Sequence, residues 1–149
     1  MNENYSLILR EIGLKATPKR LAILEELAAN LCYMTPEEIW GKLKKRFKRA
    51  GLPTIYRNLE ELSEKGVISK IVHPDRKLSY YLCRNKEHHH HFICLSCHKV
   101  DDITYCHIET VQMDIENKLE GKVLSHIMQI NGICNTCLKN KEFTHEGGK

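Results

Sequence analysis

Hydrophobic residues in the first part of the chain recur at the three- and four-residue spacing of amphipathic helices. A helix is predicted to begin at Thr17 and Pro18, because threonine can cap a helix and proline fits its first turn. A second helix is predicted to begin at Thr35, where Glu38 completes a capping box. The apolar positions of the two helices are Leu21, Leu24, Leu27 and Ala28 in the first and Ile39, Leu43 and Phe47 in the second.

A third helix is predicted over residues 54–65. Ile55, Leu59 and Leu62 recur on one side and form its buried face, and Gly66 is well placed to end it. The opposite side of its first turns carries Thr54, Tyr56, Arg57 and Asn58. Side chains of these types can reach base edges, thymine methyl groups and phosphates, so this helix is a candidate for reading DNA.

Two short segments rich in β-forming residues, 67–72 and 78–82, flank a turn-like stretch and predict a hairpin. Helices followed by a hairpin predict a winged helix-turn-helix, with residues 54–65 as its recognition helix. Additional phosphate contacts are expected from Lys15, Lys19 and Arg20. The basic segment 41–49 is interpreted equally well as a solvated helix face.

The second half alternates strand and helix. Residues 99–103 predict a strand, an amphipathic helix ended by Gly121 follows, and residues 123–130 predict another strand. The apolar face of that helix consists of Ile108, Val111, Ile115 and Leu119. The predicted fold is therefore α+β, with a winged-helix domain over residues 1–83 and a small α/β domain over residues 84–149.

The composition fits a globular chain of 149 residues, of which 42% are hydrophobic and 28% charged. No apolar run approaches the roughly 18 residues of a membrane span. The N-terminal segment also lacks the layout of a signal peptide. We therefore expect a cytoplasmic protein with no membrane partner, whose thiols stay reduced and whose paired cysteines bind metal.

Charged and metal-binding residues are unevenly distributed. Residues 1–82 hold 15 Lys and Arg against 10 Asp and Glu, whereas residues 83–149 hold 8 against 9. All seven cysteines except Cys32 and all nine histidines except His73 lie in the second part. This distribution indicates a polyanionic partner for the first domain and bound metal in the second.

Two C-x-x-C pairs give the strongest local signal, Cys94 with Cys97 and Cys134 with Cys137. Four thiolates are the tetrahedral set that structural zinc prefers. The long separation requires the intervening structure to return the second pair to the first. Unrelated cytoplasmic thiols are the weaker alternative.

Four consecutive histidines precede the first cysteine pair. In an extended chain their side chains alternate, so His89 and His91 face one way while His88 and His90 face the other. One run can thus supply two metal sites. The candidates to complete them are Cys83 for the first and Glu109 with His126 for the second.

Three segments, HHHHFICLSCHKVDD (88–102), LKATPKR (14–20) and LPTIYRNL (52–59), resemble the ferric uptake regulator family. The resemblance extends over nearly the whole chain. It implies a metal-dependent repressor, not an enzyme, that binds an inverted-repeat operator in double-stranded DNA as a homodimer. It also implies that residues 84–149 form the dimerisation domain, in which the edge strand 123–130 pairs with a second copy.

By position, the resemblance assigns structural zinc to the two C-x-x-C pairs. It assigns the sensory site, at the junction of the two domains, to His89 and His91. A further site near the dimerisation domain falls on His88, His90, Glu109 and His126, and DNA contacts fall on Lys15, Tyr56 and Arg57.

Departures from the family pattern favour Zn²⁺ over Fe²⁺ or Mn²⁺ as the regulatory metal. Iron and peroxide sensors of the family have a histidine where this chain has Tyr33, and a carboxylate near Cys83, where zinc sensors use cysteine. Thiolate and imidazole suit Zn²⁺, whereas Fe²⁺ sensing favours oxygen and nitrogen ligands. We therefore expect a zinc-dependent repressor of metal uptake genes. An iron-dependent or peroxide-sensing repressor of the same family is the alternative.

The fourth ligand of the sensory site stays open. Zinc sensors draw an aspartate from around Ser69, and the substitutes here are His73, Asp75, Asp102 or water. His98 stands where the family usually has glycine, and Cys32 and Cys106 are expected to be small buried hydrophobic residues. A zinc hydrolase is disfavoured because neither H-E-x-x-H nor H-x-E…P-C-x-x-C occurs, and no small organic substrate is expected.

Overall fold

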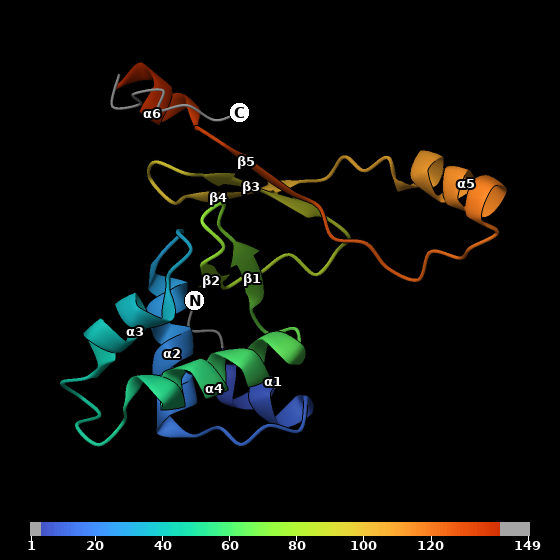
Figure 1. The fold of residues 1–149 in the computed structure, drawn as a ribbon. Helices are drawn as coiled ribbons and strands as arrows, with labels where there is room; N and C mark the ends of the chain where they lie inside the picture. Colours follow the sequence, from blue (N-terminus) through green and yellow to red (C-terminus); the bar gives the residue numbers. More distant parts are fainter. Residues whose placement is uncertain (1–3, 141–149) are drawn as a thin grey trace. The chain divides into compact units, whose positions relative to one another are not determined.

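The structure is a computed structural model that describes residues 4–140; the other residues of the two predicted domains, 1–3 and 141–149, lie outside it. The chain divides into two compact units, Met1–Arg84 and Asn85–Lys149. Helices and small sheets give the α+β class that the sequence predicts (Figure 1). No helix among residues 4–140 has the length and apolar character needed to cross a membrane.

Four helices form the first unit: α1 (Tyr5–Glu11), α2 (Pro18–Ala29), α3 (Pro36–Leu43) and α4 (Leu52–Glu64). The predicted starts of α2 and α3 are confirmed. Thr17 Oγ1 accepts a hydrogen bond of 3.3 Å from an amide of the first turn, and Thr35 with Glu38 forms a complete capping box. Gly66 follows α4 with a positive φ of 73°, as a helix-ending glycine does.

Replacing Thr35 with alanine is expected to destabilise the first unit. The Thr35 hydroxyl accepts a hydrogen bond of 3.2 Å from the Glu38 amide, and Glu38 accepts one of 2.8 Å from the Thr35 amide. Loss of such a cap lowers the free energy of unfolding by about 1 kcal/mol. Urea unfolding followed by circular dichroism measures the change, with exposed Thr104→Ala as the control. Equal stability of the two variants would contradict a role for the cap.

The apolar faces predicted for the helices meet in one core. Its buried members include Leu24, Leu27, Ile39, Leu43, Ile55, Leu59 and Leu62. All residues of this core belong to the first unit. The unit can therefore fold around apolar burial alone.

The wing is the antiparallel pair β1 (Ser69–Val72) and β2 (Leu78–Tyr81), which confirms the predicted hairpin with slightly shorter strands. Tyr80 attaches it to the helices. Its side chain is fully buried, and its hydroxyl donates a hydrogen bond of 2.6 Å to Glu60 of α4. Two backbone hydrogen bonds of 2.8 and 2.9 Å join Tyr80 to Met34. The wing is thus held against the recognition helix.

The second unit contains a three-stranded sheet in the order β4-β3-β5. Its elements are β3 (His90–Cys94), β4 (Val100–Ile103), α5 (Ile108–Leu119), β5 (Gln129–Gly132) and α6 (Asn135–Lys139). The central strand β3 pairs antiparallel with β4 and parallel with β5. This strand carries His90 and His91, the last two histidines of the run, and Cys94, the first cysteine of the C-x-x-C pairs. It therefore positions candidate ligands of all three candidate metal sites.

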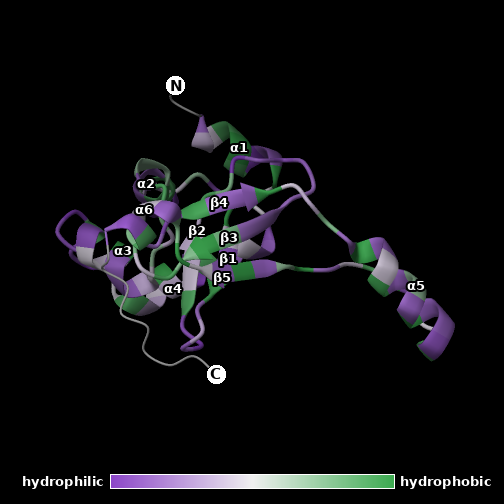
Figure 2. Ribbon diagram, turned by 90° about the horizontal axis from the view of Figure 1, so that it is seen from above, coloured by the Kyte–Doolittle hydropathy of each residue, from purple (hydrophilic) through white to green (hydrophobic). Residues whose placement is uncertain are grey.

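The predicted strand over 123–130 is wrong in its extent, because only β5 from Gln129 onward is paired. A strand needs a neighbour for its backbone groups, and residues 123–128 have no strand neighbour among the described residues. Leu124 and Ile127 are 86% and 97% exposed. The preceding helix α5 has no buried side chain and lies apart from the sheet (Figure 2). It ends at Leu119, and the left-handed residue after it is Glu120, not the predicted Gly121.

Candidate metal centres and nucleic-acid interface

The two C-x-x-C pairs come together at one end of the sheet. Cys94 ends β3 and Cys97 lies in the following turn, while Cys134 caps α6 and Cys137 lies within it. The sulfur–sulfur distances are 3.8 Å for Cys94–Cys137 and 3.7 Å for Cys97–Cys134. A tetrahedron with Zn–S bonds of about 2.3 Å has edges of about 3.8 Å, so the four thiols fit zinc.

The ionisation of these thiols also favours a cation. Burial raises the pKa of Cys94, but backbone amides, those of Cys134 and Cys97 among them, donate to its sulfur and lower the pKa to about 6 overall. Burial, together with the neighbouring thiols, raises the pKa of Cys97 to about 12. The backbone stabilises one thiolate, whereas several thiolates this close require a bound cation.

His98, which stands in place of the usual glycine, has a left-handed backbone with φ of 65°. Its amide donates a hydrogen bond of 2.9 Å to the Cys94 carbonyl and closes the turn around the first cysteine pair. Glycine adopts this conformation without strain, and histidine is among the residues that tolerate it. The glycine of the family pattern is therefore explained by backbone conformation.

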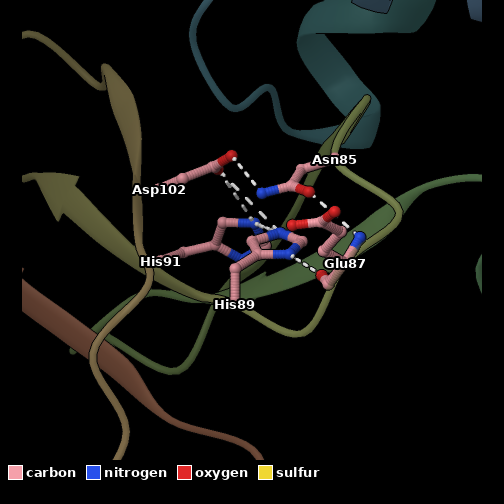
Figure 3. A network of polar contacts seen from close by, with 5 residues as sticks. All are labelled: Asn85, Glu87, His89, His91 and Asp102. Atoms are coloured by element: carbon pink, nitrogen blue, oxygen red, sulfur yellow. Dashed lines mark hydrogen bonds and ion pairs between the residues drawn. The ribbon is translucent and has the colours of Figure 1, made fainter.

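His89 and His91 form a second cluster together with Asp102 (Figure 3). Their Nε2 atoms are 3.0 Å apart, and Asp102 Oδ1 lies 3.9 Å from that of His89 and 3.8 Å from that of His91. Asp102 is opposite His91 in the β3–β4 register, and Asn85 donates a hydrogen bond of 3.1 Å to its other oxygen. Burial, and then the charge of His89, lower the pKa of His91. A low pKa favours the neutral imidazole that binds metals.

Among the candidates for the open ligand position, Asp102 lies in the cluster of His89 and His91. His73 and Asp75 lie in the turn of the wing and contact each other, with Nδ1 3.0 Å from Oδ1. Cys83 is the second-to-last residue of the first unit. Its participation in a site with His89 and His91 stays a prediction.

The other two histidines of the run, His88 and His90, lie with His126 and Cys106 in a third cluster. His126 Nε2 is 3.3 Å from His90 Nε2 and 3.2 Å from Cys106 Sγ. The His88 ring lies 4.8 Å from that of His90 and 4.9 Å from that of His126, between centroids. Burial, followed by the charge of His88, lowers the pKa of His90. Three imidazoles and a thiol thus converge on one point.

The third cluster differs from the prediction in one member. Glu109 is expected as a ligand, but it lies on the exposed first turn of α5 and outside the cluster. Cys106, expected to be a buried hydrophobic residue, is half-buried and lies against His126 instead. The cysteine belongs to no recognisable spacing motif, so only the fold reveals its position beside the histidines.

The exposed start of α4 and the N-terminal end of α2 form a basic surface in the first unit. A hollow there is lined by Lys15, Thr17, Lys19, Thr54 and Arg57, among others. Lys15 and Arg57 are exposed, and their cations can contact DNA phosphates. Tyr56 is 39% exposed, and its hydroxyl donates a hydrogen bond of 2.5 Å to Glu37. The recognition helix therefore presents a basic and aromatic first turn.

Two residues predicted to contact DNA are engaged inside the protein. Arg20 forms an ion pair with Glu61 of α4 and donates a hydrogen bond of 3.0 Å to the Lys15 carbonyl. Asn58 is buried, and its amide group donates a hydrogen bond of 2.8 Å to the Thr54 carbonyl. Both residues also line the hollow described above, and Arg20 is half-buried, so their contact with DNA stays a prediction.

Comparison with known sequences gives a consistent result. The profile of the Ferric uptake regulator family matches residues 11–131. The Ferric uptake regulation protein of Campylobacter upsaliensis is 34% identical, covering 91% of this chain and 87% of that protein. The Peroxide-responsive repressor PerR of Staphylococcus epidermidis is 30% identical, covering 87% of this chain and 85% of that protein.

Solved structures share the fold. The Vibrio cholerae ferric uptake regulator (Fur) has a TM-score of 0.62 at 30% identity and covers 88% of this chain and 100% of its own. A zinc uptake regulator complexed with zinc and DNA has a TM-score of 0.75 at 23% identity and covers 92% of each chain. At that identity, the second likeness concerns the fold alone.

Proposed function

The chain belongs to the ferric uptake regulator family, and we propose that it is a zinc-responsive repressor that binds an inverted-repeat operator as a homodimer. Members of this family are metal-responsive transcription regulators and not enzymes. Residues 1–83 would bind DNA, and residues 84–149 would dimerise and hold metal. The protein would act in the cytoplasm on metal uptake genes.

The zinc assignment rests on the cluster of His89, His91 and Asp102 completed by the thiol of Cys83. It offers two imidazoles and one carboxylate, with nitrogens 3.0 Å apart. Metal–nitrogen bonds of about 2.0–2.1 Å give edges of about 3.3 Å in a tetrahedron and about 3.0 Å in an octahedron, so the spacing fits one shared metal ion and does not by itself select zinc. Cys83 lies shortly before His89 in the sequence, close enough to add a thiolate. A sulfur donor favours Zn²⁺ over Fe²⁺ and Mn²⁺.

Regulation would follow from where these ligands lie in the chain. Cys83 belongs to the first unit and the other three to the second. A metal held by both would restrict the two units to one relative arrangement and fix the separation of the recognition helices in a dimer. Only helices at the correct separation fit successive major grooves. Metal and DNA would then bind the same state, and each would raise affinity for the other.

The homodimer would use the apolar surface of the second unit. Val111, Met113 and Leu119 of α5 are 52–73% exposed, and Leu124 and Ile127 are more so. Exposed apolar residues in such number are typical of an interface. A second copy would supply the strand neighbour that residues 123–128 lack within the described part of the chain.

Zn²⁺ titration tests the proposed function. Duplexes selected from a random pool with zinc-loaded protein should carry an inverted repeat. Fluorescence anisotropy should then show affinity falling about ten- to a hundredfold when weakly held zinc is removed by a chelator that spares the four-cysteine site. Equal affinity with and without that zinc would contradict a zinc-responsive repressor.

Peroxide sensing is the second candidate, favoured by the similarity to the Staphylococcus epidermidis repressor and by the carboxylate of Asp102 beside two histidines. Oxygen and nitrogen ligands suit Fe²⁺. An iron-loaded protein that binds DNA and loses binding after peroxide, with oxidation of His89 or His91 detected by mass spectrometry, would support this candidate over the zinc-responsive repressor.

A further inference from the structure

We propose that Cys106 supplies a thiolate ligand to the cluster of His88, His90 and His126, which makes this cluster a zinc site with one sulfur and three nitrogen donors. Neither the cysteine spacing nor the family pattern assigns a ligand role to Cys106. The site is independent of the repressor function proposed above, because it concerns metal binding within the second unit.

The distances within the cluster match a shared metal. Tetrahedral zinc bound through about 2.0–2.1 Å to nitrogen and about 2.3 Å to sulfur has N–N edges of about 3.3 Å and N–S edges of about 3.5 Å. The observed His90–His126 and Cys106–His126 distances are 3.3 and 3.2 Å. All four donor atoms lie within 4.8 Å of one another.

The orientation of the imidazole rings also supports a shared metal. The Nε2 atoms of His90 and His126 face each other, and His90 is only 3% exposed. Two imidazole nitrogens 3.3 Å apart, with the His88 ring centroid 4.8 Å from that of His90, are placed to bind one cation. A metal cation satisfies all three rings at once.

A Cys106 ligand would give this site a different metal preference from a Glu109 ligand. A carboxylate is a hard oxygen donor that accommodates Mn²⁺ and Fe²⁺, whereas a thiolate selects zinc. The cluster would therefore retain zinc when iron or manganese is in excess.

The site also explains how the isolated elements of the second unit are held. Its donors come from three segments: the start of β3, the loop before α5, and residues 121–128. α5 has no buried side chain, and residues 123–128 form no strand. A metal bound by Cys106 and His126 would fix the start of α5 and the following segment to the sheet.

Cobalt spectroscopy tests the ligand. The starting protein is the full chain with Cys83→Ser, a substitution that removes the other candidate thiolate ligand. Zinc is left in the four-cysteine site. Addition of Co²⁺ should give tetrahedral bands and the charge-transfer band of one cobalt–thiolate bond. Adding Cys106→Ser should abolish the charge-transfer band and weaken Zn²⁺ binding, measured by competition, at least tenfold. Adding Glu109→Gln instead should preserve the band and change Zn²⁺ affinity less than twofold.

Two results would overturn the proposal. One is a charge-transfer band that persists without Cys106, and the other is loss of cobalt binding in the Glu109→Gln variant alone. Alkylation of the wild-type protein provides a measurement that needs no variant. Iodoacetamide should label Cys106 after the weakly held metal is removed and leave it unlabelled after Zn²⁺ is restored. Equal labelling in both states would identify Cys106 as a thiol that merely contacts His126.

Discussion

Cys137→Ser is expected to release one zinc ion and to unfold the second unit. Cys137 is buried, and its sulfur lies 3.8 Å from that of Cys94. Removing one of four thiolates leaves a site that binds zinc far more weakly. Among the described residues of this unit, the buried hydrophobic side chains are Ile93, Cys94, Val100 and Cys137. A core of this size cannot stabilise a sheet without the metal.

The magnitude follows from the free energy of zinc binding. Structural zinc contributes about 10–16 kcal/mol in zinc-finger peptides, comparable with the roughly 5–15 kcal/mol that stabilises a whole domain. The first unit has its own core and should stay folded. Elemental analysis after a chelator has removed the weakly held metal should therefore show one zinc fewer than the wild type, and calorimetry should lose the transition of the second unit while the other remains.

Cys32→Ser is the matched control, because Cys32 lies in the first unit and outside the four-cysteine cluster. It should retain both the zinc and the two thermal transitions. A Cys137→Ser protein with full zinc content and both transitions would contradict a structural role for the four thiols.

The features predicted correctly from sequence depend on residues close together along the chain. The caps at Thr17 and Thr35 each use an amide three residues away. Alternation along an extended segment separates His89 and His91 from His88 and His90, and the structure keeps the two pairs in different clusters. Such features need no knowledge of the tertiary fold.

The features that the sequence pattern left open or missed depend on partners far away. Asp102 is one of several candidate ligands, and the β3–β4 register selects it by placing it opposite His91. Cys106 is missed, because it reaches His126 across 20 residues. Burial of Asn58 depends on how α4 packs, although its position on the helix indicates an exposed residue. The strand predicted over 123–130 has suitable alternation, but most of it has no strand neighbour among residues 4–140. Pairing, unlike propensity, cannot be deduced from one strand.

Cys83→Asp is expected to change the metal to which DNA binding responds. The wild-type protein should respond to Zn²⁺ at low concentration and only weakly to Mn²⁺, because a thiolate completes the donor set of His89, His91 and Asp102. An aspartate would give two nitrogen and two oxygen ligands, a set that suits Mn²⁺ and Fe²⁺. We expect the zinc concentration for half-maximal DNA binding to rise at least tenfold and the manganese concentration to fall.

Cys83→Ser separates loss of sulfur from gain of a carboxylate. Serine is a poor ligand, so this variant should lose the zinc response without gaining one to manganese, while its structural zinc content stays that of the wild type. If both variants instead keep the zinc response, Cys83 is not a ligand. The sensory site would then consist of His89, His91 and Asp102 with nitrogen and oxygen donors only. Such a site has the chemistry of an iron or peroxide sensor, so the behaviour of this one thiol decides between the two candidate functions.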